Sequence, residues 1–340
     1  MENDPKPLQA LLGGIGLALS IHSLLILNGT VLGVSGFVHR SARGDRAAIT
    51  SVLAMVLGGV AASCLDNNQS DGLPSTGWRF LPASLPRIIF PGLLVGMGSK
   101  LANGCTSGHM IAGISRLSKR SFVATTIFFL AAIPTAKLIH GHSLHPYGSM
   151  DWTFDHKTIH ATIVLRTLVI FWATYLISSH ILKTRRSTRI YSSPSPTIQP
   201  QWWFQYFTNL LTSFAFAMSL HVGNMDDPRK VLSFLVMPPS DAFDPTVIYL
   251  AIGALPLLMS FSRYARPDKP LFTDRWAVSQ DSKIDGQLLL GSTMFGVGWA
   301  LGGICPGPNL VNLGRSLHSG VGITDNLVWL TSMIAGGFFV

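Results

Sequence analysis

Charged residues are scarce in this sequence of 340 residues. They make up only 12% of the chain, about half the share typical of soluble domains. Apolar residues, 48% of the total, fall in blocks of roughly twenty, the length that a helix needs to cross a hydrocarbon core about 30 Å thick. This pattern argues against an ordinary soluble protein. It predicts an all-α integral membrane protein with about nine transmembrane helices.

Several chemical motifs are also missing. Three cysteines are too few for a disulfide framework, and no C-x-x-C or zinc-ligand spacing occurs, so we expect neither a metal nor another cofactor. No G-x-x-x-x-G-K-[ST] segment is present, which argues against ATP-driven transport by this chain alone. The first residues, Met1 to Gln9, lack the basic start of a secretory signal. The first apolar block is therefore expected to stay in the protein.

The net charge of +9 comes from basic residues in short loops between the apolar blocks. Loops 38–46, 183–201 and 263–283 are basic, whereas the intervening loops 67–82 and 238–244 are not. By the positive-inside rule, this alternation places the N-terminus outside and the C-terminus in the cytoplasm. We expect the plasma membrane as the location. Because the membrane topology accounts for where the basic residues lie, we expect no nucleic-acid partner.

The apolar blocks divide the chain into two transmembrane halves, residues 1–182 and 202–340, joined by a basic cytoplasmic linker at 183–201. The linker is rich in Arg, Ser and Pro, which is typical of a loop. The expected crossings are 8–28, 47–65, 84–101, 121–139 and 161–182 in the first half, and 202–221, 246–262, 284–303 and 321–340 in the second. A Gly-rich stretch is expected up to residue 37, and short broken segments are expected up to residues 117, 235 and 317.

The two halves resemble each other around two cysteines. A Gly-x-Gly pair and a leucine precede Cys105 at the same distances as in front of Cys305, and a short apolar segment follows each cysteine. The odd number of crossings expected before the second half would invert its orientation. This predicts two inverted pseudo-repeats, an arrangement found in many transporters.

Each of these two cysteines lies in a loop that interrupts an apolar segment. The loops read Gly104-Cys105-Thr106-Ser107-Gly108-His109 and Gly302-Gly303-Ile304-Cys305-Pro306-Gly307-Pro308. Irregular backbone at membrane depth is tolerated only where it lines a cavity or is buried in protein. Thr106 or Ser107 is suited to cap a short helix, and the prolines are suited to begin one. The N–H groups at such helix starts favour an anion, and a thiol adds a weak donor and a polarisable sulfur.

These segments carry a family resemblance. The stretches 96–115 and 295–314, together with 28–36 and 224–235, resemble the YeeE/YedE sulfur-transport family, whose bacterial members include thiosulfate transporters. The second half is similar to the small partner subunit of the two-chain members, so the chain resembles a fusion of both parts. The resemblance implies thiosulfate uptake through an hourglass-shaped protein, in which loop cysteines, here Cys105 and Cys305, pass the ion along. Some bacterial members have a third cysteine in or near the first loop, where this chain has Asn28.

Other polar residues near the loops are further candidates for binding the substrate. Asn28 and Asn224 lie in the loop that comes before each cysteine loop in its half. His109 either donates to the substrate or caps a helix. A doubly charged anion in a dry site also calls for a cation. The candidate cations are Lys100, Arg229, Lys230 and Arg315, for which the alternative role is to extend to the lipid headgroups.

Three functions are compatible with these residues. The first is a transporter, not an enzyme, that takes up thiosulfate across the lipid bilayer and delivers it to a cytoplasmic sulfur-accepting protein. The second is a membrane-embedded sulfur-transfer enzyme, which needs a reactive thiolate and a nearby general base. His109 is the one candidate base close to a cysteine loop. The third is a transporter of another anion, such as sulfite or sulfate.

Overall fold

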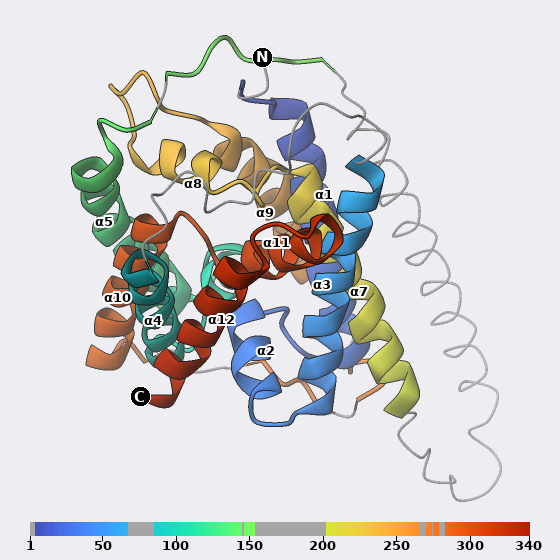
Figure 1. The fold of residues 1–340 in the computed structure, drawn as a ribbon. Coiled ribbons are helices and arrows are strands. Elements are labelled where there is room, and N and C mark those ends of the chain that lie inside the picture. The colour runs from blue at the N-terminus through green and yellow to red at the C-terminus, as the bar shows by residue number, and fades with distance from the viewer. Residues whose placement is uncertain are drawn as a thin grey trace, which may run out of the picture.

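The computed structural model describes residues 4–66, 85–144, 146–153, 202–264, 269–273, 275–278 and 283–340. Over these residues the protein consists of helices joined by loops, with no named strand (Figure 1). The predicted all-helical class is confirmed for this part of the chain. The expected crossing at 161–182 and the linker at 183–201 lie outside the described residues.

The helices of the two halves follow the same order of long and short elements. The first half contains α1 (Pro7–Asn28), α2 (Val34–Ser41), α3 (Arg46–Asp66), α4 (Leu85–Leu101), the π-helix η1 (Ser107–Gly113) and α5 (Lys119–His140). The second half contains α7 (Trp202–Val222), α8 (Pro228–Leu235), α9 (Thr246–Tyr264), α10 (Gly286–Gly302), α11 (Pro306–Ser319) and α12 (Ile323–Phe338). The fifth member of each set and α8 are the short broken segments expected from the sequence, whereas α2 is a short helix in a region where only a Gly-rich stretch was expected.

Local signals at the helix ends explain why the sequence predicts these boundaries well. Helix α1 has Pro7 in its first turn and ends at Gly29, whose φ of 67° is left-handed and whose N–H bonds to the carbonyl of Leu25. Helix α10 begins after Asp285, whose carboxylate accepts from the N–H of Leu288, and ends at the left-handed Gly303. These caps depend on neighbouring residues alone.

Five of the described helical segments are long and apolar enough to cross a membrane. They are Pro7–Asn28, Arg46–Asp66, Lys119–His140, Thr246–Tyr264 and Gly286–Ser319, the last of which combines α10 and α11. The protein is therefore consistent with an α-helical membrane protein. The expected total of about nine crossings goes beyond these five segments and stays a prediction.

Glycine lets the long helices pack with their backbones in contact, as is common between helices in membranes. A Cβ on Gly98 would lie 2.8 Å from the Cα of Phe295, and a Cβ on Gly298 would lie 3.0 Å from the backbone nitrogen of Val95. Gly298 stands 200 positions after Gly98, and Phe295 stands 200 positions after Val95. The two contacts are therefore equivalent in the two halves. The α4–α10 contact is therefore reciprocal around the two equivalent cysteine segments.

The other helix pairs follow the same reciprocity. Helix α1 packs on α9 and α7 packs on α3, while α4 packs on α12 and α10 packs on α5. Figure 1 shows α4, α10 and α12 on one side, α1, α3 and α7 on the other, and α11 between them. The short helices thus lie where the two groups of long helices meet, and this is where both cysteine loops come together.

Candidate functional site

The two cysteine loops border one small cavity in the interior of the protein. Both thiols are buried: Cys105 is 1% exposed and Cys305 is 8% exposed. The cavity has a volume of about 60 Å³, which is space for a few water molecules or one small ion. Its walls come from α1, α2, η1, α7, α8, α9, α10 and α11, so both halves of the chain contribute.

Hydroxyl groups join the loops across this cavity. The hydroxyl of Thr106 donates to the sulfur of Cys305 over 3.3 Å, which connects the first loop with the second. The hydroxyl of Ser107 lies 3.3 Å from the sulfur of Cys105 and accepts from the backbone N–H of Val34 at the start of α2. Three interruptions of the helical structure therefore meet at one point.

The structure corrects one expectation about the first loop. Thr106 stands at the N-cap position of η1, but its side chain makes no capping hydrogen bond there. The Thr106 hydroxyl is bonded to the other half of the chain, and the short helix that follows is a π-helix. Whether a hydroxyl caps its own helix or reaches a distant sulfur depends on which element lies opposite, and the local sequence does not contain this information.

In the second loop, Cys305 is the N-cap residue of α11 and Pro306 occupies the first helical position, as predicted. Pro306 and Pro308 have no N–H, so Gly307 carries the amide between them, and all three residues line the cavity. The positive end of the α11 dipole therefore faces this space, which favours a negatively charged occupant.

Trp299 supplies a polar group that the sequence analysis missed. Its side chain lines the cavity and is 2% exposed. Its ring packs against Phe129 and Phe295, with centroid distances of 5.8 and 6.4 Å. Among the described residues the indole Nε1 has no hydrogen-bond partner. A buried indole N–H normally has an acceptor, so this donor is available to a bound ligand. The one signal in the sequence is an indole six residues before Cys305 in an otherwise apolar segment.

No charged side chain is among the described residues that line the cavity. Of the candidate cations, Lys100 is not in its wall. Lys230 is buried elsewhere: its Nζ lies 2.9 Å from Oδ2 of Asp244 and 4.7 Å from the centre of the Tyr147 ring. The polar groups available in the cavity are therefore neutral donors.

Arg315 belongs to a separate buried ion network. Its guanidinium bonds to Asp226 and to Oδ2 of Asp66, the latter over 3.1 Å. His221 lies between the same two carboxylates, with Nδ1 2.8 Å from Asp226 and Nε2 3.3 Å from Asp66. This network ties the ends of α3 and α7 to α11, away from the cysteine cavity.

The remaining candidates make contacts within the protein. His109 donates from Nε2 to the carbonyl of Ala102 over 3.0 Å, and its Nδ1 lies 3.1 Å from the hydroxyl of Ser121. Of the two roles considered for His109, the bond to a carbonyl directly after α4 is of the helix-capping kind. A contact of His109 with the substrate stays a prediction. Asn28 donates to Asn209 on α7, and Asn224 donates to Gln9 on α1. Neither asparagine lines the cavity.

Family models match part of each half of the chain. A family model described as sulphur transport matches residues 8–133, and one described as a family of unknown function (DUF6691) matches residues 204–340. A protein of Xylella fastidiosa strain 9a5c named a probable transporter is 46% identical over 128 residues, which cover 37% of this chain and 90% of that protein. Two probable transporters of strain Temecula1 are 44% and 30% identical over 128 residues each, covering 37% of this chain and 90% and 82% of those proteins. No solved structure matches the chain.

Proposed function

The chain belongs to the YeeE/YedE-like sulfur-transport family, with two halves, and from this premise we propose that it takes up thiosulfate through the cavity between Cys105 and Cys305. The observation that carries the proposal is the meeting of two distant cysteine loops at one buried space, joined by the bond from Thr106 to Cys305. A transported ion needs a site that binds it and also releases it. A thiol donates a weak hydrogen bond and suits this requirement.

The neutral lining of the cavity matches the two ends of thiosulfate. Its three oxygens are hydrogen-bond acceptors, for which the indole N–H of Trp299 and the hydroxyl of Ser107 are donors. Its terminal sulfur is large and polarisable, which suits the two thiols. The helix start at α11 adds a favourable dipole without a fixed charge. An ion held in this way avoids the strong pairing with lysine or arginine that would slow its release.

The order and the reciprocal packing of the helices support two pseudo-repeats related by a two-fold axis. We propose that the second repeat, 202–340, is inverted relative to the first, 1–182, about the linker 183–201, within a protein of about nine crossings. The alternation of basic loops orients the N-terminus outside and the C-terminus inside the plasma membrane. The cysteine cavity then lies between the two sides of an hourglass-shaped path.

Transport fits the cavity better than sulfur-transfer catalysis does. An enzyme of this kind needs a base beside the reactive thiol. No His, Asp, Glu or Lys is among the described residues that line the cavity, and both ring nitrogens of His109 are engaged by Ala102 and Ser121. We therefore propose a transporter that delivers its ion to a sulfur-accepting protein in the cytoplasm.

The test is uptake of radiolabelled thiosulfate by cells that lack their own transporter. Cys105→Ser and Cys305→Ser are expected to reduce uptake strongly, because the hydroxyl is smaller and much less polarisable than the thiol. Cys64→Ser is the matched control: Cys64 is exposed, and its sulfur lies 3.6 Å from His318, outside the cavity. Membrane levels of each variant are measured by immunoblot. Full uptake by the Cys105→Ser/Cys305→Ser double variant would refute the proposed path.

Competition in the same assay identifies the anion. Unlabelled thiosulfate is expected to displace the label more effectively than sulfite or sulfate, because neither has a terminal sulfur bonded to a central sulfur atom. Equal competition by sulfate would show that the site recognises the oxygens alone, and the substrate would then be a general oxyanion.

A further inference from the structure

The buried ion network at the ends of α3 and α7 has a dry centre and one edge toward the surface. The side chains of His221 and Asp226 are 1% and 3% exposed, whereas those of Arg315 and Asp66 are 13% and 22% exposed. Ionisable side chains buried in a membrane protein often mark the route of a proton in transporters. The network is therefore examined through its hydrogen bonds, which show how many protons it holds.

The contacts of His221 require a second proton. Its Nδ1 lies 2.8 Å from Oδ2 of Asp226, and its Nε2 lies 3.3 Å from Oδ1 of Asp66. A neutral imidazole has one N–H, and an ionised carboxylate can only accept. Each of the two hydrogen bonds needs a proton between its partners. The three side chains together thus hold one proton more than a neutral histidine with two carboxylates, and the longer bond, to the more exposed Asp66, is the place where this proton is most easily exchanged.

Titratable and charged groups come to this end of α7 from several elements. Among the described residues they are Cys64 and Asp66 of α3, Asp226 and Asp227 of the loop after α7, Arg229 of α8, and Arg315 and His318 of α11. Of these, Asp66 and Asp226 bond to His221, and Arg315 bonds to both carboxylates. Helix α1 also packs on α7, and there it contributes the neutral side chain of Gln9. The proton at His221 is thus set among two carboxylates and one guanidinium.

The network shares two segments with the cysteine cavity. Leu220 and Met225 line the cavity, and each is the direct neighbour in sequence of a network residue, His221 or Asp226. The side chain of Asn312 on α11, a helix that begins at the cavity, donates to the backbone carbonyl of Asp226 over 2.8 Å. Gain or loss of a proton at the network therefore acts on the loop that brings Met225 into the cavity wall.

The end of α1, which takes the corresponding place in the first half, is held by neutral side chains. Asn28 donates to Oδ1 of Asn209 over 2.7 Å and accepts from the hydroxyl of Thr208 over 3.0 Å. Both partners belong to α7, so these bonds also join a helix end to the opposite half. Neutral hydrogen bonds are thus sufficient to hold such an end, whereas a buried ion network carries a desolvation penalty. This difference favours a function for the ionisable groups beyond holding the fold.

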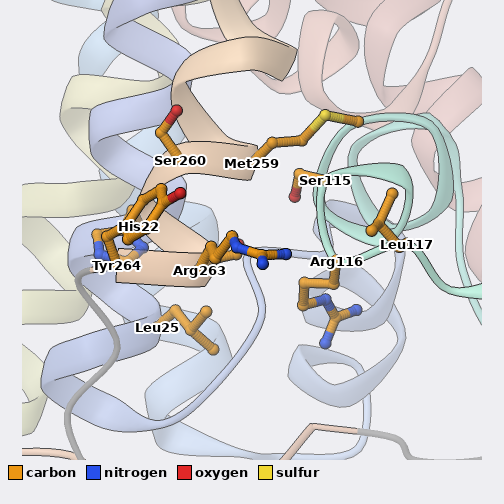
Figure 2. Close-up of a pocket in the computed structure, with 10 residues that line it drawn as sticks. His22, Leu25, Ser115, Arg116, Leu117, Met259, Ser260, Arg263 and Tyr264 are labelled. Carbon is orange, nitrogen blue, oxygen red and sulfur yellow. The ribbon is translucent and has the colours of Figure 1, made fainter.

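The network and a second, larger pocket lie toward opposite ends of α1. Asn224, in the network loop, bonds to Gln9 near the beginning of α1. The pocket has a volume of about 450 Å³ and is bordered by His22 near the end of α1 and by Met259 of α9 (Figure 2). From Gln9 to His22 the helix advances about 20 Å. In the proposed orientation the network is therefore near the outer face and this pocket near the cytoplasmic face.

We propose that His221, Asp66 and Asp226 form a proton-binding site and that one proton enters the cell with each thiosulfate ion. The inference deepens the proposed function and rests on it. A proton from the outer solution binds at the exposed edge, at Asp66, and completes the second hydrogen bond of His221. Its release toward the cytoplasm breaks that bond again and frees the loop that carries Met225. Because the proton offsets one of the two negative charges of the ion, a single negative charge crosses the membrane.

The experiment measures thiosulfate accumulation and proton movement in proteoliposomes that contain the purified full chain. The membrane potential is clamped with potassium and valinomycin, and the medium is more acidic than the lumen. For one proton per ion, a gradient of about one pH unit should raise the internal concentration of labelled thiosulfate about tenfold above the external concentration. Without a gradient, added thiosulfate should acidify the lumen, which a trapped pH-sensitive dye reports.

Asp66→Asn is the sharpest variant, because its amide can donate to Nε2 of a neutral His221 and so complete both hydrogen bonds without the second proton. It should lose accumulation and acidification but still exchange internal for external thiosulfate, since exchange needs no net proton movement. His221→Gln should show the same loss. His140→Gln is the matched control: His140 is also buried, at 3% exposed, but it lies at the end of α5, so this variant should keep accumulation and acidification.

The outcomes separate this inference from the proposed function. Equal accumulation by the wild type with and without the pH gradient would overturn the proton site and leave the path through the cysteines standing. Wild-type accumulation in both Asp66→Asn and His221→Gln would also overturn it. So would the loss of exchange in both, because the network would then only hold the fold. If the Cys105→Ser/Cys305→Ser variant keeps full proton-coupled uptake, the path through the cysteines fails and the proton site stands.

Discussion

Replacing Trp299 by Phe removes one hydrogen-bond donor from the cysteine cavity and leaves an aromatic ring in its place. The wild-type ring is 2% exposed and packs against Phe129 and Phe295, and a phenyl ring keeps most of this contact. The chemical change is therefore concentrated at Nε1, which has no partner among the described residues.

The expected size of the effect follows from this geometry. A hydrogen bond to a charged group contributes about 1.5–3 kcal/mol, which corresponds to about 10–150-fold in affinity. Trp299→Phe should therefore raise the KM for thiosulfate uptake by at least about tenfold. The protein itself should not be destabilised by the lost N–H, because that group bonds to no described protein atom.

Trp329 provides a matched control. It is also fully buried, and its Nε1 also lacks a partner among the described residues, but it lies on α12 and does not line the cavity. Trp329→Phe removes the same atoms from an equally buried position, so it should leave the KM unchanged. Concentration-dependent uptake is measured for both variants in proteoliposomes, and their folding is compared by thermal unfolding in detergent. An equal KM for wild type and Trp299→Phe, or an equal rise in both variants, would refute the role of the indole N–H.

Three further perturbations test other parts of the structure. Lys230→Met should lower the free energy of unfolding by about 3–5 kcal/mol, because it leaves the buried carboxylate of Asp244 without its cationic partner. An unchanged melting temperature would contradict a buried ion pair. Gly59→Val should prevent folding, because a Cβ at position 59 meets the backbone of α11. Gly286→Ala should be tolerated, because a Cβ at position 286 meets no atom within 4 Å. Equal yields of monodisperse protein for the two variants would contradict the close packing. Burial raises the pKa of Tyr147 to about 12, against about 10 in an unfolded chain, so its contribution to stability is present below pH 10 and is lost as the pH rises toward 12. Tyr147→Phe should therefore flatten the decline of the melting temperature above pH 10, and an identical decline in both proteins would contradict the shift.

The sequence alone predicted the long helices of the described residues and their ends, but not the short helix α2. The expected first crossing, 8–28, corresponds to α1 at Pro7–Asn28, and the expected crossing 84–101 corresponds to α4 at Leu85–Leu101. The information for these elements is local, because hydropathy sets the length of an apolar helix and glycine, proline and capping side chains mark its ends. The two cysteine loops were recognised for the same reason, since each interrupts an apolar run.

Only the tertiary structure decided what these loops contact. Thr106 reaches Cys305 across the two halves, Trp299 lines the same cavity, and Lys230 pairs with Asp244 instead of lining that cavity. Each of these contacts joins side chains from different elements, and their distances depend on how the helices cross and how closely glycine lets them approach. The residue types and their spacing along the chain predict the helices. They do not predict the angles at which the helices cross, and these angles bring two distant thiols to a single cavity.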